Sequence, residues 1–409
     1  MLLRLLALGA VAWACTTDDD CQLNGLCDAT SGACECDAAW SGESCERLRL
    51  LDAPAPLAAA YPPPAWFGNT TSWGASVVKD GATGLHHMFV AEMSGECGMA
   101  TWGRNSVIRH AVAAVAAGPY EPRELVLREF AHNPTAIRAP DGEYLLYHVG
   151  CGAPEQPKCE DCAGGVTGPS CLGGEAAAAA ARAAAPAAAD DDGAALACNA
   201  TNVASVLHAA SLDGPWAAHN AAIVPSAAMN KSWGPNRMLD NPSAVFFANG
   251  SLLMASRGGD PADEAWSDGV VTAPGWRGPY TQHGMIGEPK SAGPALASPQ
   301  VEDPFVWRDA RGHFHALFHK LTDEHPSAGG HAYSRDGWAW TLTDTAAFTT
   351  DVRTDDGATH AFFRRERPHL LFDDDGTTPL ALFTSLTNWS SGAPTDTDKA
   401  FTFAQSIAS

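Results

Sequence analysis

Asp240, Asp303 and Glu366 stand one or two positions before a proline, each at the opening of a segment that repeats along the chain. Carboxyl groups that share one concave site repel each other, so one can stay protonated while another is ionised. Such a set supports acid–base chemistry, in which one carboxyl donates a proton to a leaving oxygen and another activates water or attacks carbon. Asp240, Asp303 and Glu366 are candidates for this chemistry if the fold brings them together, and their choice as catalytic residues depends on a family resemblance described below.

Other polar side chains stand at matching positions of the same pattern, and we expect them to bind substrate. They are Glu92, His132, Asn133, His148, Arg257, Glu302, His319 and Arg367. A plainer explanation exists for any single one, because the first turn of a strand is often polar and Asp before Pro is a common turn starter. The concentration of ionisable groups at equivalent places favours a functional site.

These residues belong to a segment that repeats along the chain. Four copies share an opening polar pair and proline, an apolar strand, a turn with Asp or Asn and Gly, and a second strand. They span residues 132–150, 240–258, 302–320 and 366–385, and a weaker copy without the proline spans residues 73–92. Each copy predicts a β-hairpin, and further strand signals flank each hairpin.

Five such units predict an all-β fold, a five-bladed β-propeller over residues 73–409, in which the tail at 401–407 closes the last blade. The innermost strands of a propeller begin around a central axis, so the opening residues of all hairpins should converge there. The spacing between the first two proline-bearing copies is longer than the later spacings. The excess coincides with a Cys- and Ala-rich insertion at residues 151–198, which we expect to be a surface loop.

The blade openings resemble those of glycoside hydrolase family 43 and its relatives, the arabinanase and xylosidase group. Glu366, two positions before a proline, resembles the general acid of that family, and Asp303, directly before a proline, resembles the aspartate that tunes this acid. Asp240 is then the candidate general base. The resemblance implies a glycoside hydrolase-like protein that cleaves or binds a neutral glycan by paired-carboxylate chemistry.

The first blade departs from the family pattern, which places the base there, because it opens with Trp73 and Gly74. Three explanations remain open: Glu92 supplies the missing group, the catalytic trio is rotated around the ring, or hydrolysis has been lost while glycan binding remains. The last would make the chain a non-catalytic extracellular carbohydrate-binding or adhesion protein.

The N-terminal segment carries the features of an export signal over residues 1–14, with an apolar stretch too short to span a membrane. Six cysteines follow, at Cys15, Cys21, Cys27, Cys34, Cys36 and Cys45. Their spacing resembles an EGF-like domain over residues 15–47, and that resemblance implies bridges between Cys15 and Cys27, Cys21 and Cys34, and Cys36 and Cys45. Residues 48–72, rich in Pro and Ala, predict a stiff linker that cannot donate regular backbone hydrogen bonds.

The 12 cysteines of the chain indicate an oxidising compartment and a secreted protein. We therefore expect bridges, rather than zinc or redox chemistry, at Cys159 and Cys162 as well. Glycosylation sequons agree with this route and begin at Asn69, Asn199, Asn230, Asn249 and Asn388.

A formal net charge of -22 argues against nucleic acid as a partner. We expect no cofactor; the resemblance to family 43 implies one alternative, a Ca²⁺ ion on the propeller axis near His331, because some of its members hold such an ion. His313, His315 and His319 could group around a metal, but packing between blades is the more common role of such residues.

Overall fold

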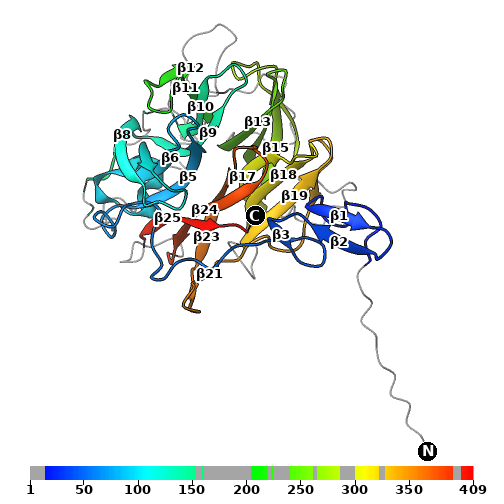
Figure 1. Cartoon of the computed structure of the whole chain (residues 1–409). Helices are drawn as coiled ribbons and strands as arrows, with labels where there is room; N and C mark the ends of the chain where they lie inside the picture. The colour runs from blue at the N-terminus through cyan, green and yellow to red at the C-terminus, as the bar shows by residue number, and fades with distance from the viewer. Residues whose placement is uncertain are drawn as a thin grey trace, which may run out of the picture.

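The computed structural model describes residues 14–150, 152, 158–160, 162, 204–219, 223, 240–260, 265–285, 300–321, 328–389 and 398–408. The predicted export signal up to residue 13 and most of the insertion at 151–198 lie outside the described residues. Five antiparallel sheets surround a central axis, and neighbouring innermost strands contact each other around the whole ring (Figure 1). The expected all-β, five-bladed propeller is therefore confirmed.

The strands of the five blades follow one another in chain order, and the first strand of each blade is the innermost. Blade one contains β5 (Ser72–Lys79), β6 (His86–Met93), β7 (Ser106–Ala113) and β8 (Glu121–Leu127). Blade two contains β9 (Ala131–Arg138), β10 (Tyr144–Gly150), β11 (Ala204–Ala209) and β12 (Ala217–His219). Blade three contains β13 (Asp240–Phe246), β14 (Leu252–Asp260), β15 (Ala265–Ala273) and β16 (Thr281–Met285). Blade four contains β17 (Gln300–Arg308), β18 (Phe314–Leu321), β19 (Ala328–Ser334) and β20 (Thr341–Leu342). Blade five contains β23 (Arg364–Phe372), β24 (Pro379–Thr387) and β25 (Ala400–Ser406).

The remaining described elements are short. Helical turns η1 (Ser94–Glu96), η2 (Met99–Thr101) and α1 (Trp102–Asn105) connect β6 to β7. A hairpin of β21 (Asp351–Arg353) and β22 (Thr359–Ala361) precedes blade five. Among the described residues, no helix has the length and hydropathy that crossing a membrane would require.

Each innermost strand bulges at its opening, where one residue adopts a positive φ. These residues are Gly74, Asn133, Asn241, Asp303 and Arg367, with φ between 49° and 79°. At each bulge the pairing with the second strand of the blade shifts register. A bulge leaves a backbone N–H outside the ladder, so a proline, which has no N–H, suits the next position. This accounts for the prolines that recur in the sequence.

The N-terminal segment closes blade five along β25. The backbone N–H groups of Leu51 and Ala60 donate to the carbonyls of Ser406 and Thr402, each at 2.9 Å. The expectation that this linker cannot donate regular backbone bonds is therefore wrong. The tail forms the third strand of blade five, paired with β24, and the N-terminal segment covers its outer edge.

A disulfide module at residues 14–48 packs against blade four beside β19 (Figure 1). It contains β1 (Gly25–Asp28), β2 (Ala33–Cys36), β3 (Trp40–Ser41) and β4 (Arg47–Leu48). Its three bridges have the pairing that the EGF-like resemblance implied. Trp40 is buried in an apolar cluster shared with Leu317 and Phe348, so the module and the propeller share part of one core.

Disulfides also form within the propeller. Cys97 pairs with Cys162, and Cys159 is also disulfide-bonded. The expectation of bridges rather than a thiolate metal site is thus confirmed for Cys159 and Cys162.

Candidate active site

The bulge residues of blades two to five form a hydrogen-bonded chain across the propeller axis. Asn133 donates through Nδ2 to Oδ1 of Asn241. Asn241 donates in turn to Oδ1 of Asp303 at 2.5 Å, and Arg367 donates to the same oxygen. Gly74 of blade one lies against Asn133 at the fifth position of the ring. A Cβ atom there would lie only 3.1 Å from the side-chain oxygen of Asn133, so the position favours glycine. Four blades thus contribute one side chain each to a single buried network.

A second layer is formed by the residues that directly precede the bulge residues in blades three to five. These are Asp240, Glu302 and Glu366, and all three side chains are largely buried. Asp240 and Glu302 share Nη1 of Arg257, which lies 3.8 Å from Oδ2 of Asp240 and makes a short ion pair with Glu302. Sequence positions more than 120 residues apart, from 240 to 366, therefore meet at one site.

His319, on β18, connects the two layers. Its Nδ1 lies 2.8 Å from Oδ2 of Asp303, and its Nε2 lies 3.4 Å from Oε2 of Glu302 and 3.9 Å from Oε2 of Glu366. Glu366 is also held by Arg364, whose Nε and Nη2 donate to its two oxygens at 2.5 and 3.0 Å. We call these residues the axial carboxylate cluster. It comprises Asp240, Arg257, Glu302, Asp303, His319, Arg364, Glu366 and Arg367.

The charges of this cluster move its pKa values in opposite directions. Burial raises the pKa of Asp240, and neighbouring arginines only partly oppose this effect. Burial also disfavours ionised Glu302, but Arg257 and His319 outweigh it and hold the pKa of Glu302 below its usual value. In the same way His319 and Arg364 lower the pKa of Glu366 against the effect of burial. Of Asp240, Glu302 and Glu366, Asp240 is therefore the carboxyl most inclined to hold a proton.

His319 itself is held in the charged form. Burial favours the neutral imidazole, but the carboxylates of Glu366 and Asp303 outweigh this effect and raise the pKa of His319 to about 10. The imidazole therefore presents N–H groups, rather than lone pairs, to the carboxylates at neutral pH.

Three of the expected binding residues lie in other local networks. Glu92 accepts two hydrogen bonds from Arg109, both at 2.9 Å, and one from Tyr61. His132 is buried beside Trp102, and its Nδ1 lies 2.7 Å from the Ser106 hydroxyl.

His148 is the third of these residues. Burial lowers its pKa to about 4, and its Nδ1 lies 3.4 Å from the Val149 carbonyl oxygen. The structure therefore brings together Asn133, Arg257, Glu302, His319 and Arg367 with the three acidic residues, but gives Glu92, His132 and His148 other contacts.

Sequence reasoning missed Arg364, which binds Glu366 and lies over the Trp73 ring at 5.4 Å. The sequence contained a signal for this contact: Arg364 stands two positions before Glu366, and residues two apart on a strand point to the same face. Blade one thus contacts the site through the ring of Trp73, which lies against Arg364, and not through a carboxylate.

The cluster is poorly suited to a cation. Asp303, His319 and Glu366 bring possible ligand atoms within 4.8 Å of one another. Arg364 and Arg367, however, pair with Glu366 and Asp303 and would compete with a cation for these carboxylates. His331, expected near an axial Ca²⁺, instead packs against Trp40 with ring centroids 4.9 Å apart. His331 therefore contacts the disulfide module instead of the axial carboxylate cluster.

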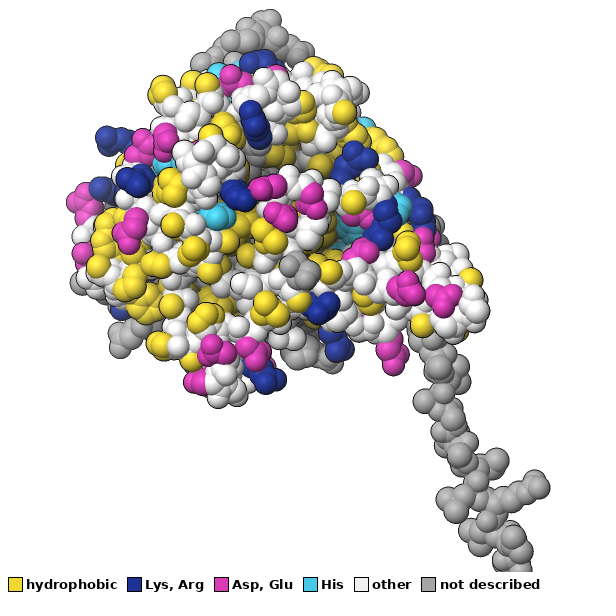
Figure 2. All heavy atoms as spheres, viewed as in Figure 1, with side chains coloured by type: hydrophobic (Ala, Val, Ile, Leu, Met, Phe, Trp, Pro, Cys, Tyr) yellow, Lys and Arg dark blue, Asp and Glu magenta, His cyan; other side chains and the backbone are white. Residues whose placement is uncertain are grey.

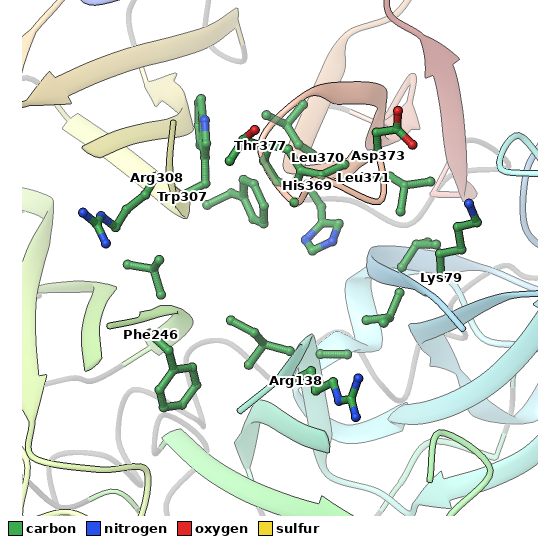
Figure 3. A pocket seen from close by; sticks show the side chains of 18 of the residues that line it. Lys79, Arg138, Phe246, Trp307, Arg308, His369, Leu370, Leu371, Asp373 and Thr377 are labelled. Atoms are coloured by element: carbon green, nitrogen blue, oxygen red, sulfur yellow. The ribbon is translucent and has the colours of Figure 1, made fainter. Parts of the chain in front are cut away.

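A cavity of about 1130 Å³ opens at the other end of the innermost strands, among the turns of the hairpins (Figure 3). Its wall includes Trp307, His369, Arg138, Arg308 and Lys79. None of the predicted site residues lines it. The axial carboxylate cluster, and with it the candidate site, lies at the opposite end of the axis, where the innermost strands begin.

Solved structures match this architecture, although no protein-family model and no curated protein matches the chain. Zg3597, a family 117 glycoside hydrolase from the marine bacterium Zobellia galactanivorans, has 12% identity and a TM-score of 0.53 over 89% of this chain and 90% of its own. The α-L-arabinofuranosidase PaAbf62A from Podospora anserina has 10% identity and a TM-score of 0.53 over 88% of this chain and 97% of its own.

An α-L-arabinofuranosidase from Lactobacillus brevis has 12% identity and a TM-score of 0.50 over 87% of this chain and 92% of its own. At such low identity the likeness concerns architecture rather than side-chain chemistry. The chain therefore has the five-bladed propeller fold that is also found in these glycoside hydrolases.

Proposed function

We propose that the protein is a glycoside hydrolase-like enzyme that acts on a neutral glycan at the axial carboxylate cluster. The observation that carries the proposal is the meeting of Asp240, Glu302, Asp303 and Glu366, from three consecutive blades, in one buried network. Oxygens of Asp303 and Glu366 lie within 4.8 Å of each other. Carboxyl groups this close share one site, and each influences the protonation of the other.

The electrostatics favour roles different from those that the family resemblance implied. Asp240, with its raised pKa, suits the proton donor, whereas Glu366, with its lowered pKa, suits the ionised carboxylate that activates water or attacks carbon. Asp303 is held by Asn241, Arg367 and His319, and suits an orienting role. The exchange of roles between Asp240 and Glu366 is part of the proposal.

The surface agrees with a neutral ligand. The chain carries a formal charge of -22, and Figure 2 shows lysine and arginine side chains scattered among acidic ones on the face it presents. A polyanionic glycan would be repelled by this net charge.

The test is release of sugar from arabinan, xylan and galactan oligosaccharides by the purified protein. Glu366→Gln and Asp240→Asn should each lower kcat by at least a hundredfold, because each removes one partner of the proton-transfer pair. Asp374→Asn, at the exposed turn between β23 and β24, is the matched control and should keep full activity. Hydrolysis that persists in Glu366→Gln would disprove the assignment.

A second function, glycan binding without hydrolysis, is favoured by one observation. Every carboxylate of the cluster has a cationic partner, and blade one offers Trp73 in place of an acid. Saturable glycan binding by calorimetry, with no product after prolonged incubation, would identify this function.

We also propose that the chain is a secreted glycoprotein and that its disulfide module is an EGF-like domain. The bridges support this proposal, because disulfides persist in oxidising compartments. The mass of the protein recovered from the medium of expressing cells, before and after glycosidase treatment, tests it.

A further inference from the structure

Two histidines of blade one face each other close to its boundary with blade two. Nδ1 of His87, on β6, lies 2.9 Å from Nε2 of His110, on β7, and the ring planes are within 16° of parallel. Both side chains are buried, with exposed fractions of 3% and 1%. Burial lowers the pKa of both residues, that of His110 to about 4, so both imidazoles are neutral at neutral pH.

Acidic side chains approach this pair from two directions. Asp213, in the turn between β11 and β12 of blade two, places Oδ1 3.9 Å from Nδ1 of His87. Possible ligand atoms of His87, His110 and Asp213 all lie within 4.8 Å of one another. Glu124, on β8, places Oε1 3.6 Å from the other ring nitrogen of His110, Nδ1. The site thus has two imidazole nitrogens, a carboxylate oxygen and an outer carboxylate.

Blade four contains the same histidine pair, but there the approaching carboxylate belongs to the same blade, with Oδ2 of Asp309 3.6 Å from Nε2 of His315. Nδ1 of His315 lies 3.1 Å from Nε2 of His331, at the strand positions equivalent to His87 and His110. The exposed side of this second pair is covered by Trp40 of the disulfide module. The repeat therefore supplies the pair in both blades, and the pair of blade one differs in that a carboxylate of the neighbouring blade, Asp213, approaches it.

The turn that carries Asp213 explains why this carboxylate is free to face a neighbour. The equivalent Asp336 of blade four accepts hydrogen bonds from the backbone of Trp338 and Ala339 at 2.8 and 2.9 Å. In blade two the first of these donors is replaced by Pro215, which has no N–H. The proline thus removes a bond that would otherwise hold the carboxylate in its own turn.

We propose that His87, His110 and Asp213 bind a divalent zinc-type cation that joins blade one to blade two. Neutral imidazole and carboxylate are common zinc ligands, and water would complete a tetrahedron on the exposed side of Asp213. Zn–N bonds of about 2.0–2.1 Å set the two nitrogens about 3.3 Å apart, so the rings would separate by only a few tenths of an ångström. Glu124 would accept the Nδ1–H of His110, the outer carboxylate contact that orients ligating histidines.

The test uses the full-length protein after removal of metal with a chelator. Calorimetric titration with Zn²⁺ should show one saturable equivalent, and Co²⁺ should give the visible absorption bands of a tetrahedral site. Asp213→Asn should weaken Zn²⁺ binding at least tenfold, and His87→Gln should abolish the Co²⁺ bands. Asp213 is 74% exposed, so its replacement should leave the fold intact.

Two controls separate this site from the other candidates. Asp336→Asn changes the equivalent turn of blade four and should leave Zn²⁺ affinity unchanged. Glu366→Gln changes the axial carboxylate cluster and should also leave it unchanged, so the result is independent of the proposed hydrolase activity. The proposal is overturned by the absence of saturable binding, by equal affinity in Asp213→Asn, or by binding that is lost in Glu366→Gln.

Discussion

At the scale of single residues, the site depends on side chains held in an uncommon backbone conformation. Asn241, Asp303 and Arg367 have φ of 51°, 64° and 60°, a region that costs most residues with a Cβ roughly 1 kcal/mol or more. Such strain persists only where surrounding contacts over-determine the conformation. Here the hydrogen-bonded chain across the axis provides those contacts.

Replacement of Asn241 tests this account. Asn241→Ala removes the hydrogen bonds with Asn133 and Asp303 and places alanine at positive φ, so the free energy of unfolding should fall by about 2–3 kcal/mol. Asn241→Gly loses the same bonds without the Cβ strain and should be about 1 kcal/mol more stable than the alanine variant. Urea denaturation measures both, and a glycine variant less stable than the alanine variant would contradict the role of strain.

The charged state of His319 predicts how stability depends on pH. Its pKa in the folded protein, about 10, lies above the ordinary value of 6.5. The contribution of charged His319 to the free energy of unfolding is therefore complete below pH 6.5 and is lost as the pH rises towards 10. Urea denaturation between these values should show a decline in the wild type that is absent from His319→Gln and retained in His313→Gln. Identical pH profiles in all three proteins would show that His319 is not charged in the fold.

At the scale of elements, the N-terminal segment protects the edge of the last blade. β25 would otherwise present unpaired backbone groups, which invite pairing with another chain. Tyr61 anchors this segment, because its hydroxyl donates to the buried carboxylate of Glu92 while its backbone pairs with Thr402. The contact links the start of the propeller to its last strand.

Removal of the Tyr61 hydroxyl tests this anchor. Tyr61→Phe should lower the free energy of unfolding by about 1.5–3 kcal/mol, the usual contribution of a hydrogen bond to a charged group. Glu92 would keep its two bonds from Arg109, so the fold should survive. Tyr144→Phe on β10, where the side chain is half-buried, serves as the control and should have little effect. An equal loss in both variants would show that the anchor contributes nothing specific.

At the scale of the whole molecule, the disulfide module and the propeller should unfold together. Trp40 is 5% exposed and packs in the apolar cluster that both parts share. We expect a single calorimetric transition with the bridges intact. Trp40→Ala should lower the temperature of that transition, since loss of a buried aromatic side chain costs about 3–5 kcal/mol.

A surface tryptophan supplies the comparison for this experiment. Trp338 is 55% exposed, so Trp338→Ala should leave the transition almost unchanged. Two separate transitions in the wild type would show instead that the module is an independent spacer.

The sequence by itself determined the number of blades, because each blade repeats one local pattern: a polar opening, in four copies a proline, a strand of alternating apolar residues, and a turn. Its cysteine spacing, through the resemblance to a known module, also implied three bridges that the structure contains. It further placed Asp240, Asp303 and Glu366 at the openings of three successive repeats, which local spacing can reveal without knowledge of the fold.

Only the tertiary structure decided the partners and charges of these residues. Arg364, His319 and Arg257 reach the carboxylates from different strands and blades, and their effects on pKa depend on burial and on distances of a few ångströms. In the structure Glu92 forms an ion pair with Arg109, and Asp213 lies beside His87 of blade one. Contacts between blades join residues far apart in the chain, so no local pattern of residues encodes them.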